Sequence, residues 1–322
     1  MNLYKPNTLH FFIAVFCMTI LSACSAVNNE TEAISDEDIE MASQIVAESI
    51  SDQNSGLMSN VYDALSDVGS DGIQYKSTDS RAKHDDHPPS GRGHERDFTH
   101  SYDPETGTHT LHFKRSMEHD RFSKEVEVIN KYIFTDPEGT FVVHPKENPD
   151  SIAAINFIGN KNGMHSGPVR QSEFSRIDTL DFAGLHATNS TITMSGNHYG
   201  AGNASIQHDS LDASRSYRLE LNFVDIEIDK ALVQANGSLE EGVTGTMTYK
   251  LLIQHNRGGE IDEKLIEGEL ELDGDGSALL RFKGASKIFE ILLGSGDVHE
   301  RRHSDKGRRG HGGGNGGNNI IP

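Results

Sequence analysis

The feature that most constrains the fold is a series of short segments in which apolar residues recur at every second position. Such alternation is typical of β-strands that bury one face. No helical pattern separates most of these segments, which favours antiparallel pairing over strands joined by crossover helices. The sequence therefore predicts a mainly β domain over residues 97–293, built as an antiparallel curled sheet, a sandwich or a partial barrel. The expected strands are residues 108–115, 125–134, 152–158, 191–194, 217–228, 243–253, 265–272 and 278–282, with a last apolar run at 288–293.

One of these segments contains a change of phase. Between residues 217 and 228 the apolar positions are odd-numbered as far as Phe223 and even-numbered from Ile226 onward. A β-bulge at Val224 and Asp225 would produce this switch and would also bend the strand. A bent strand, together with 32 glycines in the chain, favours a curled sheet over a flat one.

The segment before the β domain has a helical period instead. Ser35 precedes three acidic residues, as expected for a helix N-cap followed by a first turn that complements the helix dipole. Residues 34–69 are predicted to form two short helices that pack on the sheet, although a role in binding a partner is an alternative. Their apolar stripes comprise Ile39, Ala42, Ile45, Val46 and Ile50, and then Leu57, Val61, Tyr62, Leu65 and Val68.

Two polar segments flank the predicted domain. Residues 76–97 are rich in histidine and include Pro88 and Pro89, which indicates a linker. Residues 297–322 form a tail rich in glycine, histidine and arginine, and we expect the tail to be disordered.

The N-terminus has the pattern of an export signal. The apolar run at residues 11–21 is too short to span a bilayer and ends in Leu21, Ser22, Ala23 and Cys24. This quartet resembles the lipobox of bacterial lipoproteins. The resemblance implies that residues 1–23 are a signal peptide, that Cys24 carries acyl chains including palmitate, and that residues 24–33 are a tether. In that family, a serine after the cysteine implies the outer membrane, on either its periplasmic or its outer side; an ordinary cleaved secretory signal is the alternative.

The charge of the chain limits its partners. There are 49 acidic and 29 basic side chains, for a net charge of −20. Such a surface repels phosphate groups, so we expect no nucleic-acid partner. Contact with the membrane is expected through the lipid on Cys24 rather than through the protein surface. The partners that remain are an envelope protein, a glycan or a lipid-like ligand.

Histidines are unusually dense in one stretch, with seven of them between residues 84 and 119. Imidazole nitrogens suit zinc and copper. His84 and His87, which flank two aspartates, are the first candidate metal ligands, and His94 and His100 complete the set. Because the spacing matches no closed zinc motif, we expect at most weakly bound zinc or copper and no other cofactor. Solvated histidines without a ligand role are the alternative.

No catalytic motif points to a specific reaction. The chain lacks a nucleophile elbow, a metalloprotease helix motif, a P-loop and a dinucleotide fingerprint. We therefore expect a non-catalytic binding or scaffolding module in the cell envelope. The alternatives are a carrier that encloses an apolar ligand within the curled sheet, a divalent-metal binder that uses residues 84–119, and an envelope enzyme without recognisable motifs.

Overall fold

The structure is a computed structural model that describes residues 34–53, 56–66, 96–119, 122–168, 170–208, 211–257 and 260–301. All of the elements below belong to one compact unit that begins at Ser35. The expected signal peptide, Cys24, the tether, linker residues 76–95 and tail residues 302–322 lie outside the described residues.

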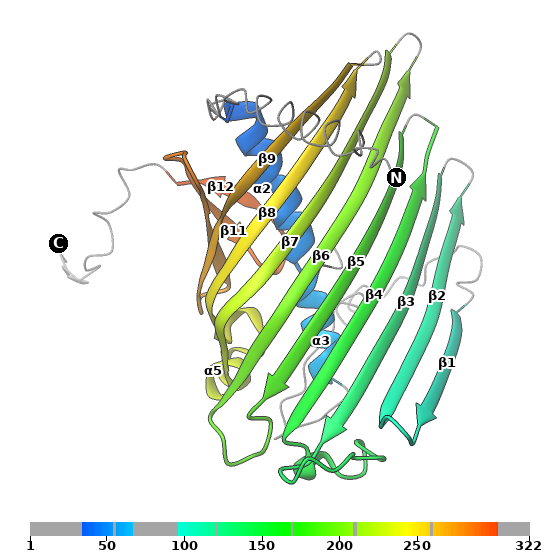
Figure 1. Cartoon of the computed structure of the whole chain (residues 1–322), viewed down its shortest axis with the longest axis vertical. Helices are drawn as coiled ribbons and strands as arrows, with labels where there is room; N and C mark the ends of the chain where they lie inside the picture. Colours follow the sequence, from blue (N-terminus) through cyan, green and yellow to red (C-terminus); the bar gives the residue numbers. More distant parts are fainter. Residues whose placement is uncertain are drawn as a thin grey trace, which may run out of the picture. The chain divides into compact units, whose positions relative to one another are not determined.

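The fold is mainly β, as predicted. Twelve antiparallel strands follow one another in chain order across a single curled sheet that does not close, because β1 and β12 each have only one neighbour (Figure 1). The strands are β1 (Arg96–Asp103), β2 (Thr108–His119), β3 (Phe122–Thr135), β4 (Ala154–Ser166), β5 (Arg170–Ala183), β6 (Thr191–His208), β7 (Leu211–Asp229), β8 (Val243–Arg257), β9 (Glu260–Asp273), β10 (Ser277–Phe282), β11 (Ile288–Leu292) and β12 (Val298–Glu300).

Several strands extend beyond the sequence predictions. The alternation did not predict β1 or β5, and it predicted only the first four residues of β6. The sheet also includes residues that were predicted to belong to the linker and the tail. Strand β1 begins at Arg96, within the predicted linker, and β12, within the predicted tail, pairs with β11. Strand β12 is only three residues long and β1 is mostly polar, so these edge strands bury too little apolar surface to show a clear two-residue alternation.

The two predicted N-terminal helices are present. They are α2 (Asp36–Ile50) and α3 (Leu57–Ser66), and both lie on the same face of the sheet (Figure 1). Ser35 caps α2 by accepting a hydrogen bond from the Asp38 amide at 3.1 Å. The shorter elements are α5 (Lys230–Asn236), which was not predicted, η2 (Pro149–Ser151) and η3 (Glu240–Gly242). Within the described ranges, no helix has the length and hydropathy needed to cross a membrane.

The core lies between the sheet and the helices. We call the sheet face toward α2 and α3 the covered face and the opposite face the open face. Along β4, for example, Ile155 and Phe157 are fully buried on the covered face, whereas Asn156 and Ile158 are exposed on the open face. Burying a large apolar side chain stabilises a fold by about 1.5–3 kcal/mol, so the covered face holds the helices in place.

The predicted bulge in β7 is confirmed. Pairing with β8 shifts between Val224 and Glu227, and Asp225 has a left-handed backbone with φ of 51°. Opposite the bulge, Gly245 has φ of 128°, and a Cβ atom there would lie 2.5 Å from the Asp225 carbonyl oxygen. Only glycine fits this position, and the bulge moves the apolar residues of β7 back to the covered face.

Candidate functional site

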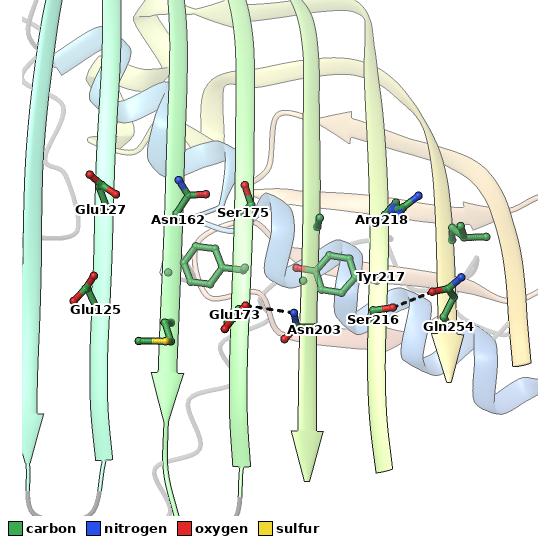
Figure 2. A pocket seen from close by; sticks show the side chains of 16 residues that line it. Glu125, Glu127, Asn162, Glu173, Ser175, Asn203, Ser216, Tyr217, Arg218 and Gln254 are labelled. Carbon is green, nitrogen blue, oxygen red and sulfur yellow. Dashed lines mark hydrogen bonds between the residues drawn. The ribbon is translucent and has the colours of Figure 1, made fainter. Parts of the chain in front are cut away.

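A shallow groove of about 500 Å³ crosses the open face of the sheet from β3 to β8 (Figure 2). Most of its lining residues are polar and point away from α2 and α3. The lining comprises Glu125, Glu127, Asn162, Gly163, Met164, Glu173, Phe174, Ser175, Ala201, Gly202, Asn203, Ser216, Tyr217, Arg218, Leu252 and Gln254. We call this site the polar groove.

Strand register places these residues in two parallel rows, each running across all six strands. The first row contains Glu127, Asn162, Ser175, Ala201, Arg218 and Leu252. The second contains Glu125, Met164, Glu173, Asn203, Ser216 and Gln254. Since neighbouring strands lie about 4.8 Å apart, each row presents a side chain at that interval over about 24 Å, and all of them except Met164 and Leu252 are polar or small.

Between the two rows, glycines alternate with aromatic residues. Gly163, Phe174, Gly202 and Tyr217 are paired in register on successive strands. The Phe174 ring lies against Gly163, and a Cβ atom on Gly202 would lie only 2.5 Å from Tyr217 Cε1. Each ring thus takes the space that the neighbouring glycine leaves free, which stabilises a strand position that glycine alone would weaken. Phe174 and Tyr217 occupy covered-face positions, as do the buried Arg176 and Leu219 two residues further along their strands, so the two rings lie behind the groove.

Hydrogen bonds orient the acidic side chains at one end of the groove. Glu125 pairs with Lys114 Nζ at 2.7 Å, and Glu127 pairs with His112 Nε2 at 2.8 Å. Near the centre, Asn203 Nδ2 donates to Glu173 Oε2 at 3.5 Å. These partners keep the carboxylates in place while their remaining lone pairs stay available to a ligand.

At the other end, Ser216 donates to the Gln254 side-chain oxygen at 3.3 Å, and Gln254 donates to Glu263 at 2.5 Å. Arg218 adds one positive charge to the first row. The groove therefore offers both donors and acceptors along its full length, and its three glutamates outnumber its one arginine.

Comparison with known proteins does not identify the site. No protein-family model, curated protein or solved structure matches this chain. Its function is therefore argued from the chemistry of the groove itself. Dense, evenly spaced donors and acceptors suit a ligand that presents many hydroxyl or amide groups.

A second set of polar side chains is buried on the covered face. Asp178 accepts hydrogen bonds from Asn60 Nδ2 of α3 and from His198 Nδ1, the second at 2.7 Å. A Cβ atom on Gly200 would lie 3.1 Å from His198 Nε2 and 3.8 Å from Ser49 Oγ, and neither atom has a hydrogen-bond partner among the described residues. Serine, histidine and aspartate are the residue types of a serine hydrolase triad, but no hydrogen bond joins Ser49 to His198. All three side chains are at most 1% exposed, however, so a substrate could reach them only if α2 moved away.

Two buried cations extend this polar cluster to both helices. Arg176 donates to the Glu48 carbonyl of α2 at 3.1 Å, and Lys161 Nζ lies 3.4 Å from Ser59 Oγ of α3. Burial lowers the pKa of Lys161, and the nearby Asp63 carboxylate partly opposes this effect. The cluster therefore attaches the helices to the sheet through polar contacts at the centre of an otherwise apolar interface.

The structure describes only one of the five site residues predicted from sequence. Cys24, His84, His87 and His94 lie outside the described residues. His100 lies on β1 with an exposed side chain, and its Nε2 atom is 3.4 Å from His109 Nδ1 on β2. The polar groove itself was not predicted, because its residues come from six strands and meet only through the register of the sheet.

Proposed function

We propose that the chain is a lipid-anchored protein of the bacterial outer membrane that binds an uncharged glycan in the polar groove without catalysing a reaction. The observation that carries this proposal is the pair of polar rows across six strands. The anchor is inferred from the lipobox at Cys24, and it would hold the folded domain close to envelope polysaccharides.

The composition of the groove favours a sugar over a protein partner. Protein interfaces depend on buried aromatic and apolar anchors. The two rows contain only Met164 and Leu252 as large apolar residues. Carboxylates and amides can instead form paired hydrogen bonds with neighbouring sugar hydroxyls. The excess of glutamates disfavours phosphorylated or acidic glycans.

The test is a glycan array probed with the full-length protein in detergent. The array contains neutral, N-acetylated, uronic-acid and phosphorylated oligosaccharides, and the best uncharged ligand is then titrated by calorimetry. Asn203→Ala removes a groove amide and should weaken binding about 3- to 10-fold, as expected for one neutral hydrogen bond. Asn197→Ala is the matched control, since Asn197 is also an exposed residue of β6 but lies outside the groove.

Two results would contradict the proposal. One is the absence of binding to every uncharged glycan on the array. The other is equal affinity of the two asparagine variants for a bound glycan. Cleavage of a bound oligosaccharide would instead support the alternative of an envelope enzyme.

The carrier alternative requires a binding site on the covered face of the sheet. A lipid-like ligand would need space on the covered face, where the fully buried Tyr132, Phe157 and Leu180 now lie beneath the helices. Such a ligand would have to displace α2 and α3. Glycan binding on the open face requires no such movement, and the groove is already formed.

The anchor has its own test. Cells are labelled with an alkyne analogue of palmitate, and the labelled lipoprotein is detected after fractionation. Cys24→Ser should abolish labelling and release the protein from the membrane fraction, whereas Cys17→Ser should leave both unchanged. Continued labelling of the Cys24→Ser variant would refute the lipobox assignment.

A further inference from the structure

A second pocket, of about 350 Å³, lies at the β1 edge of the sheet and is independent of the polar groove. His100, His109 and His144 line it together with Tyr132, Phe134 and Glu147. His109 is paired in register with Tyr132, whose hydroxyl contacts the Asp63 carbonyl of α3, so this pocket belongs to the covered face. The pocket combines an apolar floor with three imidazoles from three separate segments.

Two of these imidazoles have the spacing of metal ligands. His100 Nε2 and His109 Nδ1 are 3.4 Å apart. Two nitrogens at about 2.0–2.1 Å from a tetrahedral zinc ion are separated by about 3.3 Å, so the observed spacing needs little adjustment. The two rings are nearly parallel, with an interplanar angle of 2°, and rotation of the exposed His100 side chain would direct both lone pairs at one ion.

The surroundings of His109 hold it in place as a ligand. Its ring is 6% exposed and packs against Tyr102 at 4.5 Å and Phe134 at 5.5 Å between centroids. These ring contacts hold the His109 side chain in one orientation.

We propose that His100 and His109 bind a divalent transition-metal ion of the zinc and copper class, with His144 as the third ligand. No three histidine, cysteine or acidic side chains already converge on one point in the described part of the chain. His144 is exposed and lines the same pocket, which makes it the available third ligand. This set differs from the linker set expected from sequence and shares only His100 with it.

The experiment measures zinc binding to the full-length protein in detergent. Metal is first removed with a chelator, and one equivalent of Zn²⁺ is then titrated by calorimetry in competition with a chelating dye, so that only the tightest site is filled. Copper is measured in the same way. The wild-type chain should bind one ion and show a higher melting temperature with zinc, because a ligand of the folded state stabilises that state.

The variants identify the ligands. His109→Phe keeps the aromatic packing and should weaken zinc binding tenfold or more, and His100→Ala, at an exposed position, should do the same without affecting folding. His112→Ala is the matched control, because His112 lies on the same strand but bonds to Glu127 on the open face. The site is refuted if His109→Phe and His100→Ala bind zinc like the wild type. It is also refuted if affinity falls in a His84→Ala/His87→Ala variant and not in His109→Phe, which would place the metal on the linker instead.

Discussion

Replacement of Asp178 by alanine tests whether the buried polar cluster attaches the helices to the sheet. The Asp178 side chain is fully buried and accepts hydrogen bonds from Asn60 of α3 and from His198. Its negative charge also acts on the buried Lys161. Asp178→Ala therefore removes one acceptor and leaves two buried donors and one buried cation without it.

The expected loss follows from these contacts. A buried polar group that loses its partner costs about 1–3 kcal/mol, and removal of one member of a buried charged pair costs about 3–5 kcal/mol. Because the contributions share one site they do not add fully, and we expect Asp178→Ala to lower the free energy of unfolding by about 3–5 kcal/mol. Asp178→Asn keeps the shape and one acceptor oxygen, so its loss should be about 1–3 kcal/mol.

The assay is urea unfolding followed by circular dichroism, since the chain contains no tryptophan. Asp181→Ala is the matched control. Asp181 lies on the same strand but faces outward, is exposed, and accepts a hydrogen bond from Asn156. Its replacement should change the free energy of unfolding by less than about 1 kcal/mol. If Asp178→Ala were as stable as Asp181→Ala, the cluster would not hold the helices and the reasoning would be wrong.

Three further predictions concern other contacts. Tyr62 of α3 hydrogen-bonds the buried Glu240, so Tyr62→Phe should lower the free energy of unfolding in urea by about 1–3 kcal/mol; a loss below about 0.5 kcal/mol would show that this contact is dispensable. Gly202→Ala should lower the free energy of unfolding by about 1–3 kcal/mol, because the added methyl group would overlap the Tyr217 ring. In a double-mutant cycle, Tyr217→Leu should reduce this loss, and fully additive losses of the two variants would refute the overlap. Burial lowers the pKa of His109 below its ordinary value of 6.5 on folding, so between the folded and unfolded pKa values the unfolded chain binds more protons than the folded chain. The free energy of unfolding should therefore fall as the pH drops below about 6.5. His109→Phe should remove this part of the pH dependence, and an unchanged pH profile would contradict the prediction.

The sequence predicted those strands in which apolar residues alternate without interruption. The bulge of β7 was predicted in the same way, because Phe223 and Ile226 lie on opposite sides of a change of phase. Strand β5 was not predicted, since two of its covered-face positions hold Arg176 and Asp178 instead of apolar residues. A period-two pattern identifies a strand only when the buried face is apolar, so the strand that carries the polar cluster escaped recognition.

Strand β6 was missed for a related reason. From residue 196 to residue 202, its covered-face positions are occupied by His198 and by three glycines, which have little or no apolar surface. Gly202 is the residue against which the Tyr217 ring lies on the covered face, behind the polar groove. The residues that weaken the strand signal are thus the ones that shape the two candidate sites, and long-range register supplied what the local pattern lacked.

The histidine prediction shows the same limit. Composition drew attention to the stretch that contains His100, and it grouped His100 with its neighbours in sequence. The structure instead brings His100 next to His109, because β1 and β2 form a hairpin in which Tyr102 is opposite His109. Pairing across strands determines which imidazoles can share an ion, and no count of histidines along the chain contains that information.

The two faces of the sheet allow the binding hypotheses to be separated with one variant. A carrier must release α2 and α3 to expose the covered face, so weakening their attachment with Asp178→Ala should increase its binding of an apolar probe such as a fluorescent fatty acid. A glycan-binding module uses the open face, and Asp178 does not line the polar groove. The same variant should then bind glycan with unchanged affinity at temperatures where it remains folded. Increased binding of the apolar probe would indicate that the covered face carries the function. Unchanged glycan binding, without a gain in binding of the apolar probe, would indicate the open face.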